Sequence, residues 1–465
     1  MKPNEILEGV RQFIATNQSA FIDQLCDFLR IPSVSTDPDY REDVCEAADF
    51  LARHMKDIGV AYVEVIPTRG HPIVMGHTEL DPRRPTVLVY GHYDVQPPDP
   101  YDLWESPPFE PDVRNGRIYA RGAADDKGQL FGHLKAFEWM HQNGVLPCNV
   151  KFVFEGEEEI GSPHLARFLA ANHERLACDV VLVSDTSMLS LQTPSITVGL
   201  RGLSYFEITF RGPDRDLHSG IYGGALLNPA NALANLIASL HDPMGRITVP
   251  HLYDEVAPPS PEEHEVIEYM RIWDAKIQEE AGVLALSGEA GLSAYERIAF
   301  RPSLDVNGMW SGYTGEGSKT IIPAEAHAKF SIRLVPNQQH EKINELVRKF
   351  VDANIPKGIK ASLKVYHGGD PYWLSPSSLE YRAASAAIAD VFGKRALPLR
   401  TGGSIPVVSD FKKHLGAETV LLGFGLDSDA IHSPNEHFGV ENFLLEIQTI
   451  PLFHWYYAHL KQAGR

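Results

Sequence analysis

The segment TVLVYGHYD (86–94) indicates the fold of this chain more directly than any other stretch. Its first five residues form an apolar, β-branched run that is typical of a strand buried on both faces. Two polar side chains, His92 and Asp94, follow the run at once. Open α/β sheets form their sites at the carboxyl ends of parallel strands, so we expect both side chains to lie in such a crevice.

Three more segments repeat this arrangement of an apolar run followed by polar residues. They are VKFVF (150–154) before EGEEEIGS, VVLV (180–183) before Ser184-Asp185, and TVLL (419–422) before GFGLDSDAIHSPNE. Helical patterns such as 129–142 lie between the runs. Strands that alternate with helices predict an α/β fold with a mostly parallel sheet. We therefore expect four loops that are distant in sequence to converge at one edge of that sheet.

The middle of the chain has a different pattern and predicts a second domain. It contains, in order, a strand (205–210), a helix (229–240), an insertion (241–303), strands (304–313 and 325–335), a helix (340–351) and a strand (362–366). This βαββαβ order is the ferredoxin-like pattern. We predict an inserted domain over 197–378 within a catalytic domain made of 1–196 and 379–465. The insertion contains a predicted helix near 261–281, and its role does not follow from the sequence.

Composition narrows the class of protein. The chain has 465 residues, with 42 Lys and Arg against 61 Asp and Glu, a net charge of −19. Binding to nucleic acid requires basic surface that neutralises phosphates, so we expect no nucleic-acid partner and no attraction to an anionic membrane. We find neither the apolar core of a signal peptide nor an apolar run of membrane-spanning length. The four cysteines are scattered without a CxxC pair, so we expect reduced thiols in a cytoplasmic protein.

Several polar motifs are candidates for metal chemistry. In His92-Tyr93-Asp94 the carboxylate is placed to hold the second ring nitrogen of a metal-binding histidine. In RGAADDKGQ (121–129), Asp126 also fits a helix N-cap, but two adjacent carboxylates repel each other unless a cation neutralises them. In EGEEE (155–159), one glutamate can bind metal while its neighbour moves a proton.

Asp185 and His432 complete the candidate set, although each has a simpler explanation when considered alone. Asp185 fits a capping residue, and His432 fits a surface histidine. Together with His92, Asp125 and Glu159 they supply two nitrogen and three carboxylate ligands, a set suited to zinc or manganese. Competing motifs fail, because GGSIP is not GxSxG, GYTGEGSKT is not a phosphate loop, and GFGLDS lacks the third glycine of a dinucleotide fingerprint.

Taken together, the motifs resemble the metallopeptidase family that includes carnosinase, cytosolic nonspecific dipeptidase, aminoacylase and carboxypeptidase G. The matching pieces run in family order over nearly the whole chain; they are GHYDVQP, RGAADDKGQ, FEGEEEIGS, VSDT, RGLSYFEI, DLHSGIYGG, KTIIP, FSIRLVP, HGGDP, GGSIPV and IHSPNE. DLHSGIYGG, FSIRLVP and GGSIPV point to the dipeptidase branch.

The resemblance implies a role for each matching residue. His92 and Asp185 are expected to hold one ion, Glu159 and His432 the other, and Asp125 to bridge both. Asp94 is expected to orient His92, and Glu158 to act as general base and then acid. The resemblance also implies a cis peptide bond between Asp125 and Asp126, a homodimer, and a set of substrate-binding residues, namely His218, Thr320, Arg333, His367 and Ser404. His218 is expected to reach across the dimer interface.

Two departures from the family pattern leave the substrate open. Glu157 stands where carnosinases usually have methionine, and Thr401 stands where several relatives have glutamate. We therefore expect a hydrolase with two divalent ions, zinc or manganese, that cleaves dipeptides. The alternatives are hydrolysis of N-acyl amino acids or of terminal residues of short peptides, and, more remotely, a non-catalytic binding protein on the same fold.

Overall fold

A computed structural model describes residues 1–403 and 405–463, with the side chains of His367 and Pro406 excepted. The chain divides into two compact units. Unit 1 comprises Met1–Val198, Leu374–Leu399 and Asp410–Arg465, and unit 2 comprises Gly199–Trp373 and Arg400–Ser409. Each unit has its own sheet and its own apolar core.

The main sheet of unit 1 has four parallel strands at its centre. These are β6 (Asn149–Glu155), β3 (Thr86–His92), β7 (Val180–Val183) and β18 (Glu418–Leu421), paired in that order. Antiparallel strands extend it on both sides, with β1 (Tyr62–Ile66) and β2 (Ile73–His77) on the β6 side and β9 (Ser195–Leu200) beyond β18. The short β16 (Tyr372–Trp373) and β17 (Leu397–Arg400) pair with β9. The predicted α/β fold with a mainly parallel sheet is confirmed, because every central strand was anticipated from its apolar run.

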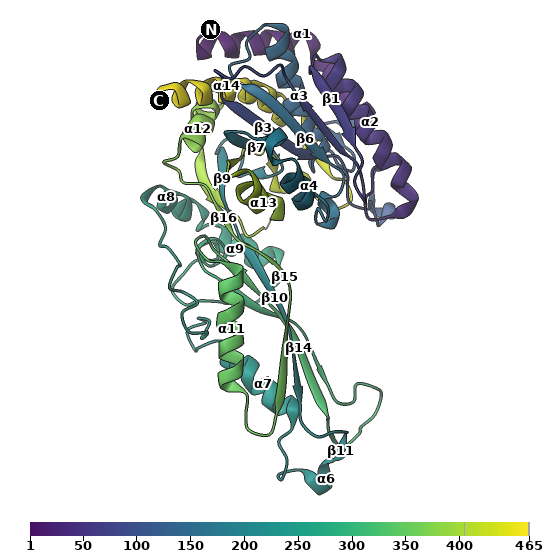
Figure 1. Ribbon diagram of the computed structural model, residues 1–465, viewed down its shortest axis with the longest axis vertical. Coiled ribbons are helices and arrows are strands. Elements are labelled where there is room, and N and C mark those ends of the chain that lie inside the picture. Colours follow the sequence, from purple (N-terminus) through teal and green to yellow (C-terminus); the bar gives the residue numbers. More distant parts are fainter. Residues whose placement is uncertain (404, 464–465) are drawn as a thin grey trace. The chain divides into compact units, whose positions relative to one another are not determined.

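Helices cover this sheet (Figure 1). Four of them pack together: α1 (Pro3–Leu29), α3 (Lys127–Gln142), α12 (Leu379–Phe392) and α14 (Val440–Ala463). Of these, α3 also packs on β3, whereas α2 (Arg41–Asp57) packs on β1 and β2. Shorter helices follow the strands, namely α4 (Leu165–Ala171), α5 (His173–Leu176) and α13 (Pro406–Leu415). Within the described part of the chain, no helix is both long and apolar enough to cross a bilayer.

Two small sheets bring distant loops to the carboxyl edge of the main sheet. In one, β20 (His437–Gly439) pairs with β5 (Arg117–Tyr119), which pairs with β4 (Asp112–Arg114). In the other, β19 (Gly425–Leu426) pairs with β8 (Ser187–Met188). The first sheet therefore fixes the loop before α3 beside a segment that lies more than 300 residues later.

Unit 2 contains a four-stranded antiparallel sheet in the order β12-β14-β10-β15. The strands are β10 (Gly202–Arg211), β12 (Ser303–Ser311), β14 (Glu325–Leu334) and β15 (Lys360–Gly369), and α7 (Pro229–Ser239) and α11 (His340–Asn354) pack on them. Side chains of β10 alternate between buried and half-buried, so that Phe206, Ile208 and Phe210 enter the core. This arrangement is the predicted ferredoxin-like βαββαβ fold. A separate two-stranded sheet joins β11 (Leu217–His218) to β13 (Ile321–Ile322), and α6 (Ser219–Tyr222) follows β11.

The insertion in unit 2 contains three helices: α8 (Pro261–Met270), α9 (Trp273–Glu280) and α10 (Ala294–Phe300). The prediction of one helix near 261–281 is therefore wrong, because α8 ends in a tight turn in which the N–H of Arg271 donates to Glu268 O. Apolar residues continue at helical spacing through α9, so periodicity alone does not reveal the break. Capping boxes at Ser260 and Ser293 define the starts of α8 and α10.

Candidate metal centre

All five predicted metal ligands lie in unit 1, and four of them lie at the ends of its parallel strands or in the segments that follow these strands. His92 is the last residue of β3, and Asp185 comes two residues after β7. Glu159 lies in the 3₁₀ turn Glu158–Ile160 after β6, and His432 lies in the loop after β18. Asp125 immediately precedes the cap of α3. The carboxyl edge of the sheet thus collects side chains from segments that are far apart in sequence.

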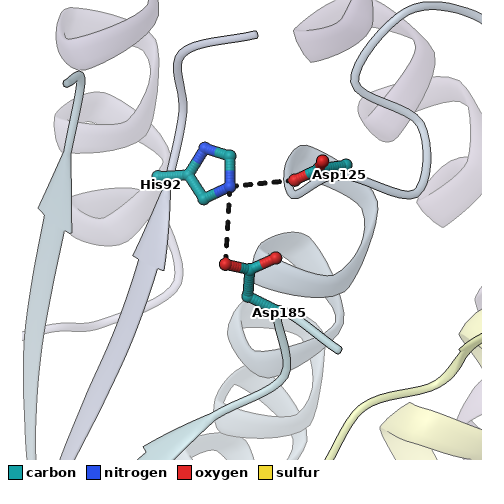
Figure 2. Close-up of side chains that lie close together, drawn as sticks. All are labelled: His92, Asp125 and Asp185. Carbon is teal, nitrogen blue, oxygen red and sulfur yellow. Dashed lines mark hydrogen bonds and ion pairs between the residues drawn. The ribbon is translucent and has the colours of Figure 1, made fainter. Parts of the chain in front are cut away.

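One group consists of His92, Asp125 and Asp185 (Figure 2). His92 Nε2 lies 3.0 Å from Asp125 Oδ1 and 3.7 Å from Asp185 Oδ2. The His92 side chain is fully buried, and the two carboxylates are 13% and 14% exposed. The three side chains point toward one another from three different elements. A nitrogen and two oxygens at these distances can share one cation.

The second group consists of Asp125, Glu159 and His432. His432 Nε2 lies 2.9 Å from Asp125 Oδ2 and 3.4 Å from Glu159 Oε2. In each group the candidate ligand atoms all lie within 4.8 Å of one another. Asp125 belongs to both groups and presents a different oxygen to each histidine. A carboxylate placed in this way is able to bridge two cations.

Asp94 connects the first group to the glutamate turn. His92 Nδ1 lies 3.1 Å from the backbone oxygen of Asp94 and 3.4 Å from its Oδ1. The two carboxylate oxygens of Asp94 also accept the backbone N–H groups of Glu158 and Glu159, at 3.2 and 3.1 Å. The position of the glutamate turn therefore depends on Asp94, whose side chain is fully buried.

Charges in the cluster perturb one another strongly. Hydrogen bonds that the imidazole donates to Asp125 and then to Glu159 raise the pKa of His432 to about 10. Burial alone would lower the pKa of His92, but Asp185, Asp125 and Asp94 raise it well above its ordinary value. Burial raises the pKa of Asp185 to about 6. The carboxylates around both histidines concentrate negative charge that divalent cations would neutralise.

Glu158 lies beside the cluster and has a perturbed pKa of its own. Burial raises its pKa to about 9, and the charges of Asp185, Asp125 and Glu159 act in the same direction, against that of His92. A carboxyl group with a pKa raised toward neutrality suits proton transfer.

The donor set fits divalent metal. Glu159 Oε1 is buried and accepts no hydrogen bond from any residue that the structure describes, so one ligand atom is available in the second group. Imidazole nitrogen and carboxylate oxygen suit zinc and manganese. The peptide bond between Asp125 and Asp126 is cis, as the resemblance implies. Asp126 Oδ2 accepts the backbone N–H of His92 at 3.2 Å, which links the loop before α3 to the end of β3.

Glu436 holds the backbone around Asp125 in place, and the sequence did not single it out. Its Oε1 accepts the backbone N–H groups of Ala124 and Asp125, at 3.0 and 3.1 Å. Its Oε2 accepts the N–H of Gly122 at 2.9 Å and Arg121 Nη1 at 2.7 Å. The only signal was its place at the end of IHSPNE, since three of its four bonds come from backbone N–H groups, which no sequence pattern records.

Two further glutamate contacts were also missed. Gln96 Nε2 donates to Glu159 Oε2 at 2.8 Å, which orients that side chain. Glu157 points away from the cluster, where it accepts the backbone N–H of His71 at 3.1 Å and pairs with His164 Nδ1 at 2.9 Å. The imidazole and the backbone amide explain how a glutamate is accommodated at this buried position.

The candidate substrate residues lie in unit 2, and the described ones fall at two places. His218 pairs with Ile321 in the β11–β13 ladder, and Ser219 N–H donates to the backbone oxygen of Thr320 at 3.1 Å. His218 is exposed, and its Nδ1 accepts the N–H of Gly220. Arg333 lies near the other end of β14, opposite Leu203 and Ser303. The side chain of His367 and the whole of Ser404 lie outside the described residues.

Comparison with known proteins assigns the family. Residues 88–451 match the family model described as peptidase family M20/M25/M40. The Cys-Gly metallodipeptidase dug1 of Schizosaccharomyces pombe is 34% identical over 459 residues, covering 95% of this chain and 96% of that protein. Human Beta-Ala-His dipeptidase is 31% identical over 480 residues, covering 99% and 94%.

A solved structure agrees with both sequence relatives. The M20 family metallo-carboxypeptidase Sso-CP2 of Sulfolobus solfataricus superposes with a TM-score of 0.79 at 32% identity, covering 94% of this chain and 99% of that one. The resemblance inferred from the motifs is thereby confirmed. The chain belongs to the M20/M25/M40 peptidase family of metal-dependent hydrolases.

Proposed function

We propose that this chain is a dipeptidase that works with two divalent ions held by the two groups around Asp125. The observation that carries the proposal is that the two carboxylate oxygens of Asp125 have different partners. Oδ1 faces His92, and Oδ2 faces His432. His92 and Asp185 would hold one ion, Glu159 and His432 the other. The names of the fission-yeast and human relatives support a dipeptide as substrate.

Each side chain near the metal groups has a chemical task in this proposal. Bound divalent ions would lower the pKa of water and polarise the scissile carbonyl. Glu158 takes a proton from the attacking water and gives it to the leaving amine as the carbon–nitrogen bond breaks. Cations next to Glu158 favour its ionised form, which a general base requires. Asp94 fixes the ring of His92 and the backbone of the glutamate turn.

We propose zinc as the metal, with manganese as the alternative, because two imidazoles and three carboxylates suit both. The four cysteines are unpaired, which supports a reducing, cytoplasmic setting.

Carboxypeptidase-type cleavage is the second candidate function, since the Sulfolobus relative is named a metallo-carboxypeptidase.

The separation of substrate residues within unit 2 supports a homodimer. Thr320 lies before the start of β14 (Glu325–Leu334), whereas Arg333 lies near its end. At about 3.3 Å per residue, that length of strand separates them by about 25 Å. A dipeptide spans only about 7 Å. Thr320 and Arg333 of the same chain therefore cannot both contact one dipeptide. A second copy would supply His218 and Thr320, while Arg333 binds the carboxylate of the substrate through its planar fork.

A substrate panel with metal removal tests the proposal. We expect the purified protein to hydrolyse dipeptides, to lose activity in EDTA, and to regain it with zinc or manganese. Dipeptides, acetylated amino acids and tripeptides measured side by side separate dipeptidase, acylase and carboxypeptidase activity. Full activity after thorough metal removal would contradict the proposal, as would a metal content of zero in the active protein.

A further inference from the structure

The insertion that the sequence left without a role makes specific contacts with Arg400, the last residue of β17. Arg400 Nε donates to Glu263 Oε1 at 2.5 Å, and Nη2 donates to Glu263 Oε2 at 3.1 Å. The two side chains are 5% and 1% exposed. A charge pair this deeply buried keeps its geometry only while both partners remain, because either charge alone would lack compensation.

Both partners are also held by further bonds. Glu263 Oε2 accepts the backbone N–H of Ser260 at 2.8 Å, so the carboxylate that binds Arg400 is oriented by its own helix, α8. The guanidinium of Arg400 lies 4.4 Å from the ring centre of Phe300 on α10. On the same helix, the Tyr295 hydroxyl accepts the backbone N–H of Arg400 at 3.1 Å. The insertion therefore fixes the side chain and the main chain of Arg400 independently.

The residues directly after Arg400 are packed on the same unit. Thr401 N–H donates to Gly199 O, and Gly403 O accepts the N–H of Arg201, both at 2.9 Å. At Gly402, a Cβ atom would lie 2.9 Å from Ile298 Cγ2 of α10. Real Cβ atoms do not approach this closely, so the loop lies against α10 without room for a side chain. The segment 401–403 leads into Ser404, a proposed substrate-binding residue.

We propose that the insertion is the positioning device for the substrate-binding loop that begins at Thr401, with Glu263 and Tyr295 as its two positioning residues. Neither residue needs to touch substrate, since both act through Arg400. The inference rests on the proposed function, because it assigns the loop to substrate binding. It explains why a buried ion pair and a buried hydroxyl converge on the one residue that precedes the loop.

Two substitutions in the full-length, metal-loaded protein test the proposal. Glu263→Gln keeps the size of the side chain and removes the charge pair, and Tyr295→Phe removes only the hydroxyl. Each is expected to raise KM about fivefold or more with kcat within about twofold, the signature of lost substrate binding. Two metal ions per subunit should remain. Tyr295→Phe keeps the test valid if Glu263→Gln does not fold.

Leu236→Ala is the matched control, because it truncates a buried side chain of α7 that belongs to the apolar core of the same unit. It should lower the melting temperature and leave KM unchanged. The positioning role is overturned if KM stays at the wild-type value in both folded variants. It is also overturned if Leu236→Ala raises KM equally, or if kcat falls while KM is constant.

Hydrogen exchange separates failure of this inference from failure of the proposed function. Peptides covering 400–403 should exchange faster in Glu263→Gln than in wild type, because the contacts with the insertion protect the backbone N–H groups of Arg400 and Thr401. A wild-type protein without peptidase activity overturns the proposed function, whatever the exchange shows. If hydrogen exchange is unchanged in an active Glu263→Gln protein, the positioning role of Glu263 is overturned. Faster exchange with unchanged KM overturns the assignment of the loop to substrate binding.

Discussion

Among single residues, Glu158 offers the most direct test of the chemistry. Its pKa is raised by burial to about 9, and it belongs to neither group of candidate ligands. We expect Glu158→Ala to keep both metal ions and to lose kcat by about 10²-fold or more, because the proton shuttle is removed. Steady-state kinetics with elemental analysis of the same sample checks both statements. Loss of metal from this variant would make Glu158 a ligand and would contradict the role of general base.

Glu436 provides a second test at this scale. A glutamine has one oxygen and one amide group, so Glu436→Gln cannot accept all four hydrogen bonds around the loop 121–125. We expect metal affinity to fall about 10- to 100-fold, as for other residues that orient ligands without touching the metal. Competition with a chelator measures it. Glu441→Gln, on the exposed first turn of α14, is the control, and equal losses in both variants would contradict a specific role for Glu436.

Four of the candidate ligands could be proposed from sequence because each lies after an apolar run, and the position of a strand end is visible in the pattern. Asp125 was proposed instead from its adjacent carboxylate, Asp126. Glu436 and Gln96 could not, because their partners are a backbone loop and a side chain from distant segments. The sequence also left the order of the glutamates uncertain at Glu157. The structure assigns that residue to His164 and His71 and directs Glu159 toward His432.

At the scale of secondary-structure elements, α14 buries a histidine that links stability to pH. Burial lowers the pKa of His454 to about 3, while an unfolded histidine titrates near 6.5. Below about pH 6.5 the unfolded chain therefore binds a proton that the folded chain does not, and the free energy of unfolding falls as pH falls. His454→Gln should reduce this pH slope by about 1.4 kcal/mol per pH unit between pH 6 and 4.

Urea unfolding in EDTA at several pH values measures that slope without contributions from metal release. His459→Gln removes an exposed histidine from the same helix and should leave the slope unchanged. An unchanged slope in His454→Gln would show that this histidine is protonated in the folded protein.

Elements were predictable where one physical signal dominated. The buried runs of β3, β6, β7 and β18 and the periodic helices α3, α7 and α11 were all expected close to their observed bounds. The antiparallel strand β1 was not, because it is short and half-exposed and lacks a continuous apolar run. The break between α8 and α9 was missed because apolar spacing continues across it.

At the scale of the whole molecule, mixing of inactive variants tests the proposed dimer. His218→Ala and Arg333→Ala should each be nearly inactive, since each removes a proposed substrate contact. In a mixed dimer with sites shared between subunits, one site would combine the intact His218 and the intact Arg333. Random reassortment of the two variants should then restore roughly a quarter of wild-type activity. No recovery after verified subunit exchange would place both residues in the site of one subunit and contradict the shared site.

The position of β18 in the main sheet has a consequence for how the protein is made. This strand lies between β7 and β9, yet it follows the whole of unit 2 in the sequence. During synthesis on the ribosome, the edge of β7, four apolar residues long, stays unpaired until β18 has been made. Roughly 200 residues are added in this interval, which takes on the order of ten seconds or more at normal elongation speeds. An unpaired apolar edge invites association with other nascent chains during that interval. We therefore expect the yield of soluble protein to depend on chaperones that shield β7 until β18 emerges.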